Sequence, residues 1–234
     1  MVKRINMLQL RHTEDEAIEV GIDEAGRGCL WGPLYAAAVI WPPEMTPEQE
    51  AIAPLIKDSK KVTAKRRIAL AQSIKDHALD WGIGIVSSAE IDQLGMTKAN
   101  QLAFTRALNS LSIEPERLLI DGILSIYENP WCFTEQVVEP EADGKYLPVA
   151  AASILAKTEH DAWVREFCDL NENIAERYDL TSCKGYGTAK HRAGILEFGE
   201  HEFHRKLFLR KLYAGRQVED DSMLKMKEEF TELE

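Results

Sequence analysis

The stretch GIDEAGRGCLWGP occupies residues 21–33, and it predicts both the first strand of the fold and a candidate site. Its first residues complete an apolar, β-branched run at residues 17–24, which predicts a buried strand. Two adjacent carboxylates, Asp23 and Glu24, lie at the end of this strand. Because carboxylates are seldom buried unless they are paired or bind a cation, this placement indicates a cation site.

Strand geometry restricts how the two carboxylates could share one site. Regular pleating directs Asp23 and Glu24 to opposite faces, so a shared site requires the strand to bulge or to end there. The tripeptide Gly26-Arg27-Gly28 follows at once and is compatible with such an ending. The alternative interpretation is a solvated turn in which Arg27 forms an ion pair.

Strands and helices alternate along the rest of the chain. Further strands are predicted at residues 34–41, 81–86, 117–120 and 133–138. Helices are predicted at residues 63–80 and 96–111 and from residue 149 onward, with a capping box at Ser87 and Glu90. The expected apolar stripe of the first helix is Ile68, Ala71, Ile74 and Ala78. This order predicts an α/β fold with a mixed β-sheet flanked by helices, and a helical C-terminal part from about residue 160.

The composition predicts one folded domain with an acidic extension. The chain has 234 residues, 45% of them hydrophobic, and a net charge of −11. That charge argues against indiscriminate attraction to nucleic acid or to an anionic membrane. We expect one domain at residues 1–215 and an acidic tail at residues 216–234.

The cysteine pattern and the N-terminus bear on location. The four cysteines contain no C-x-x-C pair, which argues against a zinc knuckle or a disulfide framework. They are Cys29, Cys132, Cys168 and Cys183. Neither a signal-peptide core nor a run of ~18 apolar residues is found, so the sequence predicts a cytoplasmic protein without a membrane partner.

Two more acids could complete a metal site. Asp121 ends the apolar run LLID, and Asp143 precedes an alanine-rich helix. Each alone is more typical of a turn or a cap. Together with Asp23 and Glu24 they form a set of hard oxygen ligands, which suits Mg²⁺ or Mn²⁺ rather than Zn²⁺.

Two histidines near the C-terminus are a weaker metal candidate. His201 and His204 have i, i+3 spacing, but no third ligand is evident. We expect these two to pack in the core or to contact phosphate near Arg205, and His191 to be structural.

Six motifs in a fixed order resemble those of bacterial ribonuclease HII. They are GIDEAGRG at 21–28, DSKK at 58–61, IDG at 120–122, DGKYLPVAAASILAK at 143–157, KGYGTAKH at 184–191 and FHRKLF at 203–208. The resemblance covers residues 20–208. It implies a ribonuclease H-like fold and an endoribonuclease that hydrolyses RNA paired to DNA, including single ribonucleotides embedded in duplex DNA, leaving 5′-phosphate and 3′-hydroxyl ends.

The resemblance also implies which residues act. The family's four catalytic acids fall on Asp23, Glu24, Asp121 and Asp143, which would hold two Mg²⁺ or Mn²⁺ ions ~3.5–4 Å apart. The GRG loop would contact the ribose 2′-hydroxyl, and the tyrosine of KGYG would sense an RNA-to-DNA junction. The residues expected to bind substrate are Gly26, Arg27, Gly28, Ser59, Lys60, Lys61, Lys184 and Tyr186. The expected partners are RNA–DNA hybrids and ribonucleotide-containing duplex DNA, with no obligate protein partner and a monomeric state.

The chain departs from the family pattern near these motifs. Cys29 and Trp31 stand where a proline and a small residue are usual, which affects the substrate preference expected of the GRG loop. His160 stands where an Arg-Asp pair usually follows SILAK, and we expect it to weaken an internal ion pair. Alternative functions are another nuclease of the same fold and a catalytically silent nucleic-acid-binding module.

Overall fold

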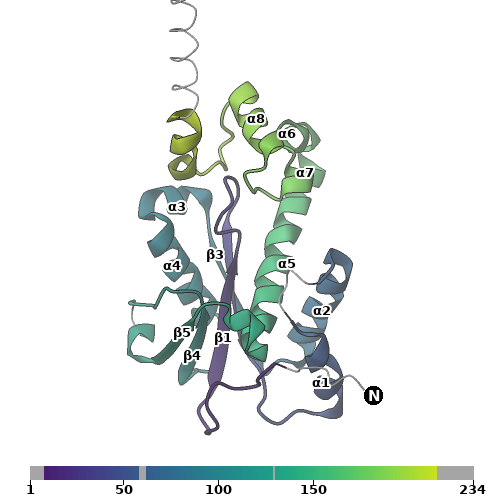
Figure 1. Ribbon diagram of the computed structural model, residues 1–234, viewed down its shortest axis with the longest axis vertical. Helices are drawn as coiled ribbons and strands as arrows, with labels where there is room; N and C mark the ends of the chain where they lie inside the picture. Colours follow the sequence, from purple (N-terminus) through teal and green to yellow (C-terminus); the bar gives the residue numbers. More distant parts are fainter. Residues whose placement is uncertain (1–7, 58–61, 129, 215–234) are drawn as a thin grey trace, which may run out of the picture.

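The fold is a five-stranded mixed sheet, seen in a computed structural model that describes residues 8–57, 62–128 and 130–214 (Figure 1). The strands are β1 (Glu19–Ala25), β2 (Leu34–Ile40), β3 (Asp80–Val86), β4 (Arg117–Asp121) and β5 (Glu135–Glu139). Their order across the sheet is β3-β2-β1-β4-β5. β2 pairs antiparallel with β1 and β3, whereas β4 pairs parallel with β1 and β5. The predicted mixed α/β sheet is confirmed.

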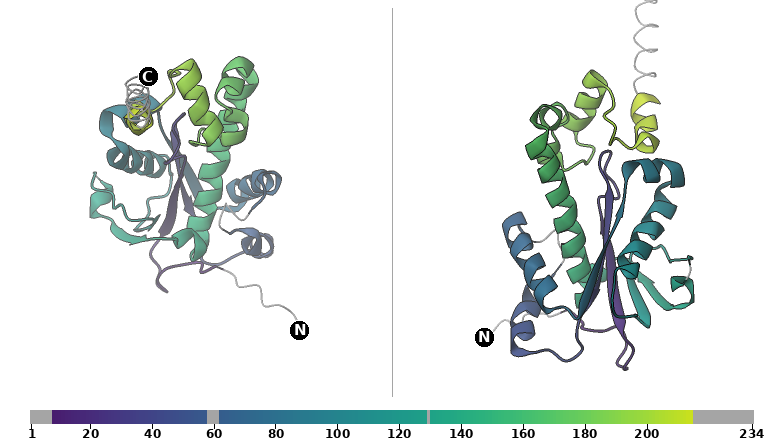
Figure 2. Two further views of the ribbon diagram at one scale, coloured as in Figure 1. Left: turned by 45° about the horizontal axis from the view of Figure 1, so that its top comes forward. Right: turned by 180° about the vertical axis from the view of Figure 1, so that it is seen from behind.

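Helices cover both faces of this sheet (Figures 1 and 2). The helix α4 (Met96–Asn109) packs on one face, and the long helix α5 (Leu147–Leu170) packs on the other with α2 (Ala64–His77) outside it. The shorter elements are α1 (Pro47–Ile52), η1 (Ala53–Leu55), α3 (Ser88–Leu94), η3 (Trp131–Phe133), η4 (Ala142–Gly144), α6 (Glu172–Arg177), α7 (Leu180–Cys183) and α8 (Ala189–Phe198). Beyond α8, residues 206–214 are helical, so the helical C-terminal part is present.

The central strand β1 is buried on both faces because its side chains alternate between two cores. Val20 and Ile22 belong to the core under α4, whereas Ala25 belongs to the core under α5. Gly21 faces α5, and a Cβ there would lie 2.2 Å from the backbone carbon of Pro148. A residue without a side chain at this position therefore lets α5 approach the strand that carries the first two acids.

Most predicted elements form within a few residues of their expected ends. The capping box is confirmed, since the Ser87 side chain accepts a hydrogen bond from the backbone of Glu90 at 3.3 Å. The stripe predicted for α2 is partly wrong, because Ile68 is 46% exposed while Leu70 is buried. Ala71 and Ile74 of the predicted stripe are buried, and Leu70 rather than Ile68 completes the buried face.

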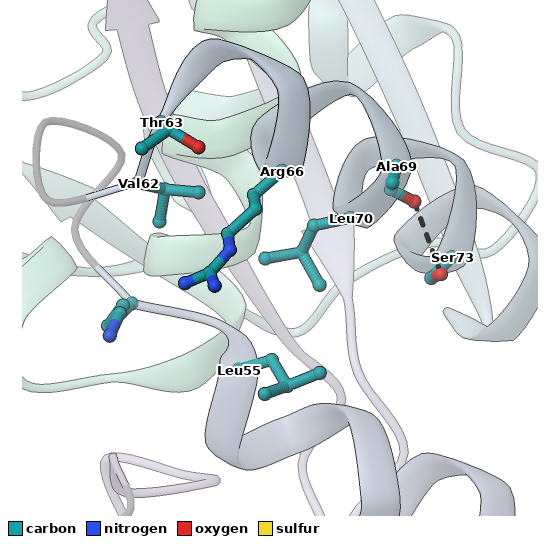
Figure 3. Close-up of a pocket in the computed structure, with 8 residues that line it drawn as sticks. Leu55, Val62, Thr63, Arg66, Ala69, Leu70 and Ser73 are labelled. Carbon is teal, nitrogen blue, oxygen red and sulfur yellow. Dashed lines mark hydrogen bonds between the residues drawn. The ribbon is translucent and has the colours of Figure 1, made fainter.

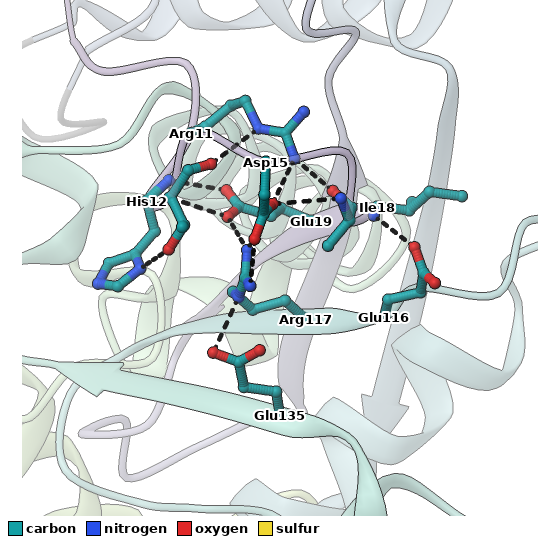
Figure 4. A network of polar contacts seen from close by, with 10 residues as sticks. Arg11, His12, Asp15, Ile18, Glu19, Glu116, Arg117 and Glu135 are labelled. Carbon is teal, nitrogen blue, oxygen red and sulfur yellow. Dashed lines mark hydrogen bonds and ion pairs between the residues drawn. The ribbon is translucent and has the colours of Figure 1, made fainter.

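The end of the sheet where β1 and β4 begin is held together by a buried arginine (Figure 4). Arg117 of β4 forms ion pairs with Asp15 at 2.7 Å, Glu19 at 2.7 Å and Glu135 at 3.0 Å. Glu19 in turn accepts the backbone N–H of His12 at 2.7 Å. This network links the N-terminal segment to three neighbouring strands.

The helical C-terminal part has its own core, which encloses Trp31 from the GRG-containing stretch. The predicted acidic tail, residues 216–234, lies outside the described residues. Of the helices described, none is both long enough and apolar enough to span a bilayer.

Candidate active site

Three of the four predicted acids line one pocket at the end of the central strands. β1 and β4 are parallel neighbours, so Glu24 and Asp121 arrive at the same edge of the sheet. The pocket has a volume of about 460 Å³. Its lining comprises Asp23, Glu24, Ala25, Gly26, Arg27, Gly28, Asp121, Ser153, Lys157 and Tyr186. Acids, the GRG loop and the KGYG tyrosine therefore meet in one place.

Asp23 is held from the α5 side of the sheet. Its carboxylate accepts hydrogen bonds from the Ser153 hydroxyl and, at 2.7 Å, from the backbone N–H of Glu24. The residue is only 6% exposed. Burial, followed by repulsion from Glu24 and Asp121, raises the pKa of Asp23 well above its usual value.

Glu24 is held from the opposite side of the sheet, where α4 lies. Asn100 of α4 donates a hydrogen bond to its carboxylate, and Arg27 lies 3.6 Å from it. Burial raises the pKa of Glu24, and Arg27 opposes that shift. The two acids thus face opposite ways, as pleating requires, and reach one pocket because β1 ends at Ala25.

Asp121 and Asp143 are linked through the backbone. The Asp121 carboxylate accepts the N–H of Ala142 at 2.7 Å, which fixes the short helix η4. Asp143 lies in η4 and is buried, but it is not among the residues that line the pocket. The structure therefore brings three predicted acids together and places the fourth beside them on a segment that Asp121 holds.

The donor chemistry of the pocket fits a divalent cation. Its acids offer only oxygen ligands, and burial together with the neighbouring acids disfavours the charged forms of Asp23 and Glu24 in the absence of a cation. In addition, the buried Oδ1 of Asn100 has no hydrogen-bond partner within the described chain. No three His, Cys, Asp or Glu side chains of the described ranges form a group that could hold a metal ion. Mg²⁺ commonly binds one or two carboxylates and completes its shell with water and substrate phosphate, so an open set of acids suits it.

The GRG loop is packed against α5 and the KGYG segment. Gly26 has φ +84°, and a Cβ there would lie 2.6 Å from the ring of His160. The backbone N–H of Gly26 donates to the Tyr186 hydroxyl. Lys157 lies 5.1 Å above the Tyr186 ring. The loop and the tyrosine are therefore a single packed unit on one wall of the pocket.

Comparison with known proteins assigns the chain to a family. The family model described as Ribonuclease HII matches residues 20–211. The chain belongs to the ribonuclease HII family. Ribonuclease HII of Bacteroides thetaiotaomicron is 44% identical over 199 residues, which cover 85% of this chain and 93% of that protein. Ribonuclease HII of Porphyromonas gingivalis is 41% identical, with 90% and 98% covered.

Solved structures agree with this assignment. The crystal structure of ribonuclease H2 from Pyrococcus horikoshii OT3 aligns with a TM-score of 0.64 and 28% identity, covering 83% of this chain and 96% of that one. The RNase HII of the PCNA complex from Archaeoglobus fulgidus aligns with a TM-score of 0.63 and 29% identity, covering 81% and 94%. The ribonuclease HII resemblance and its fold are confirmed, and the chain is a metal-dependent ribonuclease H hydrolase.

Of the lysines predicted to bind substrate in this ribonuclease HII, Lys184 alone lies among the described residues. Ser59, Lys60 and Lys61 lie outside the described residues. Lys184 ends α7 in a left-handed conformation with φ 51°, and it does not line the pocket. Its carbonyl instead accepts a hydrogen bond from the Cys29 thiol at 3.5 Å.

A second cavity of about 460 Å³ borders α2 in this family member (Figure 3). Of the residues that line it, Lys57 and Arg66 are charged, and both belong to the basic run at residues 57–67. None of the four predicted acids is among the described residues that line it.

Sequence reasoning missed two residues that line the ribonuclease HII pocket, and one that holds Glu24 from behind it. Ser153 and Lys157 lie one helical turn apart on α5, and Asn100 lies on α4. The i, i+4 spacing of Ser153 and Lys157 within the matched motif was a usable signal. Asn100 gave none, because its importance depends on α4 packing across from Glu24.

The departures from the ribonuclease HII pattern are accommodated. Trp31 is fully buried and packs against Trp163 and Phe167, away from the pocket. The Cys29 sulfur lies 3.7 Å from His160 Nε2, so two of the departures touch each other. Asp161 beside His160 retains its ion pairs.

Those ion pairs join Asp161 to Arg67 at 2.9 Å and to Lys157 at 2.8 Å. His160 Nδ1 lies 3.1 Å from the same carboxylate. Since both cations stay bound in the structure, the weakening expected from His160 concerns the strength of this interaction and stays a prediction.

The C-terminal histidines of this ribonuclease HII are structural in the described fold. His204 Nδ1 accepts the backbone N–H of His201 at 2.7 Å, so neutral His204 carries its proton on Nε2. That Nε2–H donates to His191 Nε2 at 3.1 Å, and His191 Nδ1–H donates to the Tyr186 carbonyl at 3.0 Å. The pair packs in the core and supports the KGYG segment.

Proposed function

We propose that this protein is an endoribonuclease that hydrolyses the RNA strand of RNA–DNA hybrids and incises duplex DNA at embedded ribonucleotides. The observation that supports this most directly is the shared pocket, in which three carboxylates lie beside the GRG loop and Tyr186. Acids alone would suit many nucleases. A loop of backbone groups next to them adds a means of recognising ribose.

We propose that Asp23, Glu24, Asp121 and Asp143 hold two Mg²⁺ or Mn²⁺ ions. Bound there, the ions would supply activation of a water for in-line attack on phosphorus and charge stabilisation at the departing 3′-oxygen, which would leave 5′-phosphate and 3′-hydroxyl ends. In this chain Ser153 orients the Asp23 carboxylate and Asn100 orients Glu24. The roles of these side chains are to bind the ions and to keep the carboxylates in place.

Gly26, Arg27 and Gly28 are proposed to contact the ribose 2′-hydroxyl through their backbone. Tyr186 is 37% exposed, and its ring lies at the same pocket, where it could pack on the deoxyribose beyond the scissile step. The lysines at 60, 61 and 184 are proposed to bind phosphates, which would make affinity fall with salt. We propose a cytoplasmic monomer that acts on hybrid and ribonucleotide-containing duplexes.

The decisive experiment uses a DNA duplex that carries one ribonucleotide, incubated with and without Mg²⁺. We expect a single nick at the ribonucleotide only when the metal is present. Asp121→Asn should lower the cleavage rate at least about a hundredfold while the variant still binds the duplex. Full turnover by Asp121→Asn, or equal nicking of an all-DNA duplex, would contradict the proposal.

The role of Tyr186 is tested separately by Tyr186→Ala. This variant should lose about tenfold in kcat/KM on a single embedded ribonucleotide and less on a uniform hybrid, because only the former always presents a junction. Tyr186→Phe keeps the ring and serves as the control. Equal losses on both substrates would remove the tyrosine from junction sensing.

A further inference from the structure

Arg205 is a buried arginine whose guanidinium donates its hydrogen bonds to backbone carbonyls. The residue has no exposed surface. Its Nε donates to the carbonyl of Gly32 at 2.9 Å, one terminal nitrogen donates to Gly26 at 2.7 Å and Arg27 at 3.1 Å, and the other donates to Pro33 at 2.9 Å. All four acceptors belong to the GRG-containing stretch.

The positive charge of Arg205 is stabilised by hydrogen bonds to backbone carbonyls. Within the described ranges its side-chain hydrogen bonds all go to backbone carbonyls, and the nearby Asp92 accepts the backbone N–H groups of Lys206 and Leu207. Burial lowers the pKa of Arg205 to about 10, so it remains charged at neutral pH. A buried cation is costly unless its donors are satisfied, and here the loop carbonyls satisfy them.

The geometry of the peptide bond fixes the direction of the N–H groups that follow the carbonyls bound by Arg205. In a trans peptide the carbonyl of one residue and the N–H of the next point opposite ways. The Gly26 and Arg27 carbonyls point at Arg205, so the N–H groups of Arg27 and Gly28 point away from it. Both residues line the pocket, and the described chain supplies no acceptor for either N–H. Two parallel donors therefore face the space beside the acids.

We propose that Arg205 is a positioning residue that aims the N–H groups of Arg27 and Gly28 at an oxygen of the ribonucleotide. The ribose selectivity of the loop then depends on a side chain that never touches the substrate. This inference rests on the proposed function, in which the loop contacts the 2′-hydroxyl. It adds a residue from the FHRKLF segment, almost 180 positions away from the loop it orients.

The test measures ribose discrimination in the non-cleaving Asp121→Asn protein. The dissociation constant is determined in Mg²⁺ for a duplex with one ribonucleotide and for the same duplex in all-DNA form. Adding Arg205→Lys should reduce the ratio of the two constants about tenfold, because a lysine keeps the charge but cannot donate to four separate carbonyls. Affinity for the all-DNA duplex should stay the same.

A matched control is Lys206→Met, which removes an exposed positive charge from the neighbouring position. It should weaken binding of both duplexes equally. If the parent protein already shows no preference for the ribonucleotide, the proposed function fails and this inference with it. If the parent discriminates and folded Arg205→Lys discriminates equally well, only the role of Arg205 is overturned.

A second measurement does not depend on whether an Arg205 variant folds. Amide hydrogen exchange of Arg27 and Gly28 is followed in the Asp121→Asn protein with Arg205 intact. Both amides should exchange rapidly in the free protein and become protected by the ribonucleotide duplex but not by all-DNA duplex. Amides that are already protected in the free protein, or that are not protected by the ribonucleotide duplex, would contradict the orientation argued above.

Discussion

Asp23 is a residue whose burial disfavours its charged form in the metal-free protein. Its carboxylate is buried beside two other acids, and both features raise its pKa. In a metal-free protein such a group contributes stability below its unfolded pKa of about 4 and loses it as pH rises through the folded value. A divalent cation would oppose this shift in pKa by stabilising the charged form.

We therefore expect Asp23→Asn to stabilise the metal-free protein by about 1 kcal/mol at pH 8 while abolishing cleavage. The amide keeps the shape of the side chain and removes its charge. Thermal unfolding with and without Mg²⁺ measures the effect, and the ion should raise the melting temperature of the parent more than that of the variant. A variant less stable than the parent at pH 8 would show that the charge is not the dominant cost.

At the scale of elements, α5 organises the site. It supplies Ser153 and Lys157 to the pocket and His160 beneath the GRG loop, all from one rigid helix. Its place depends on Gly21 of β1, against which the first turn of α5 packs at backbone distance. The sequence predicted an alanine-rich helix here, but it did not show which strand residue permits the close approach of that helix.

Gly21→Ala should destabilise the protein by about 2 kcal/mol, because the new methyl group would force the backbone of α5 away from β1. Chemical denaturation measures this loss. Gly144→Ala is the matched control, since a Cβ there meets nothing within 4 Å. If the two substitutions cost the same, close packing of α5 is not what requires glycine at position 21.

At the scale of the whole molecule, the two ends of the sheet are specialised differently. One end carries the acids and the loops that surround them, and the other carries the ion-pair network of Arg117. Within that network the Arg117 guanidinium lowers the pKa of Asp15 to about 2. Its contribution to stability is thus present above pH 4 and is lost as pH falls towards 2.

We expect Arg117→Met to cost about 3 kcal/mol, because Glu19 would remain buried without its cation. Urea unfolding at neutral pH measures the loss, and the double variant with Glu19→Gln should recover part of it. Cleavage by the folded fraction should not change, since the network lies at the end of the sheet away from the acids. A variant as stable as the parent would show that the network contributes no net stability.

The sequence predicted the fold more completely than the site. Local patterns located each strand, and the order of six motifs identified the family. The carboxylates at strand ends were also visible, since acids after apolar runs are conspicuous. Contacts between distant segments were not visible, such as those of Asn100 with Glu24 and of Arg205 with Gly26. The roles assigned to the four acids, to the GRG loop, to Tyr186 and to the lysines stay predictions.

The first two acids are braced from opposite faces of the sheet, Asp23 by α5 and Glu24 by α4. These helices belong to separate cores, so the distance between the two carboxylates depends on how both helices pack against β1. Loosening of either layer should weaken the binding of an ion by these acids before the protein unfolds globally. The affinity for Mg²⁺ should therefore fall when the packing of either core is weakened, before the free energy of global unfolding is lost.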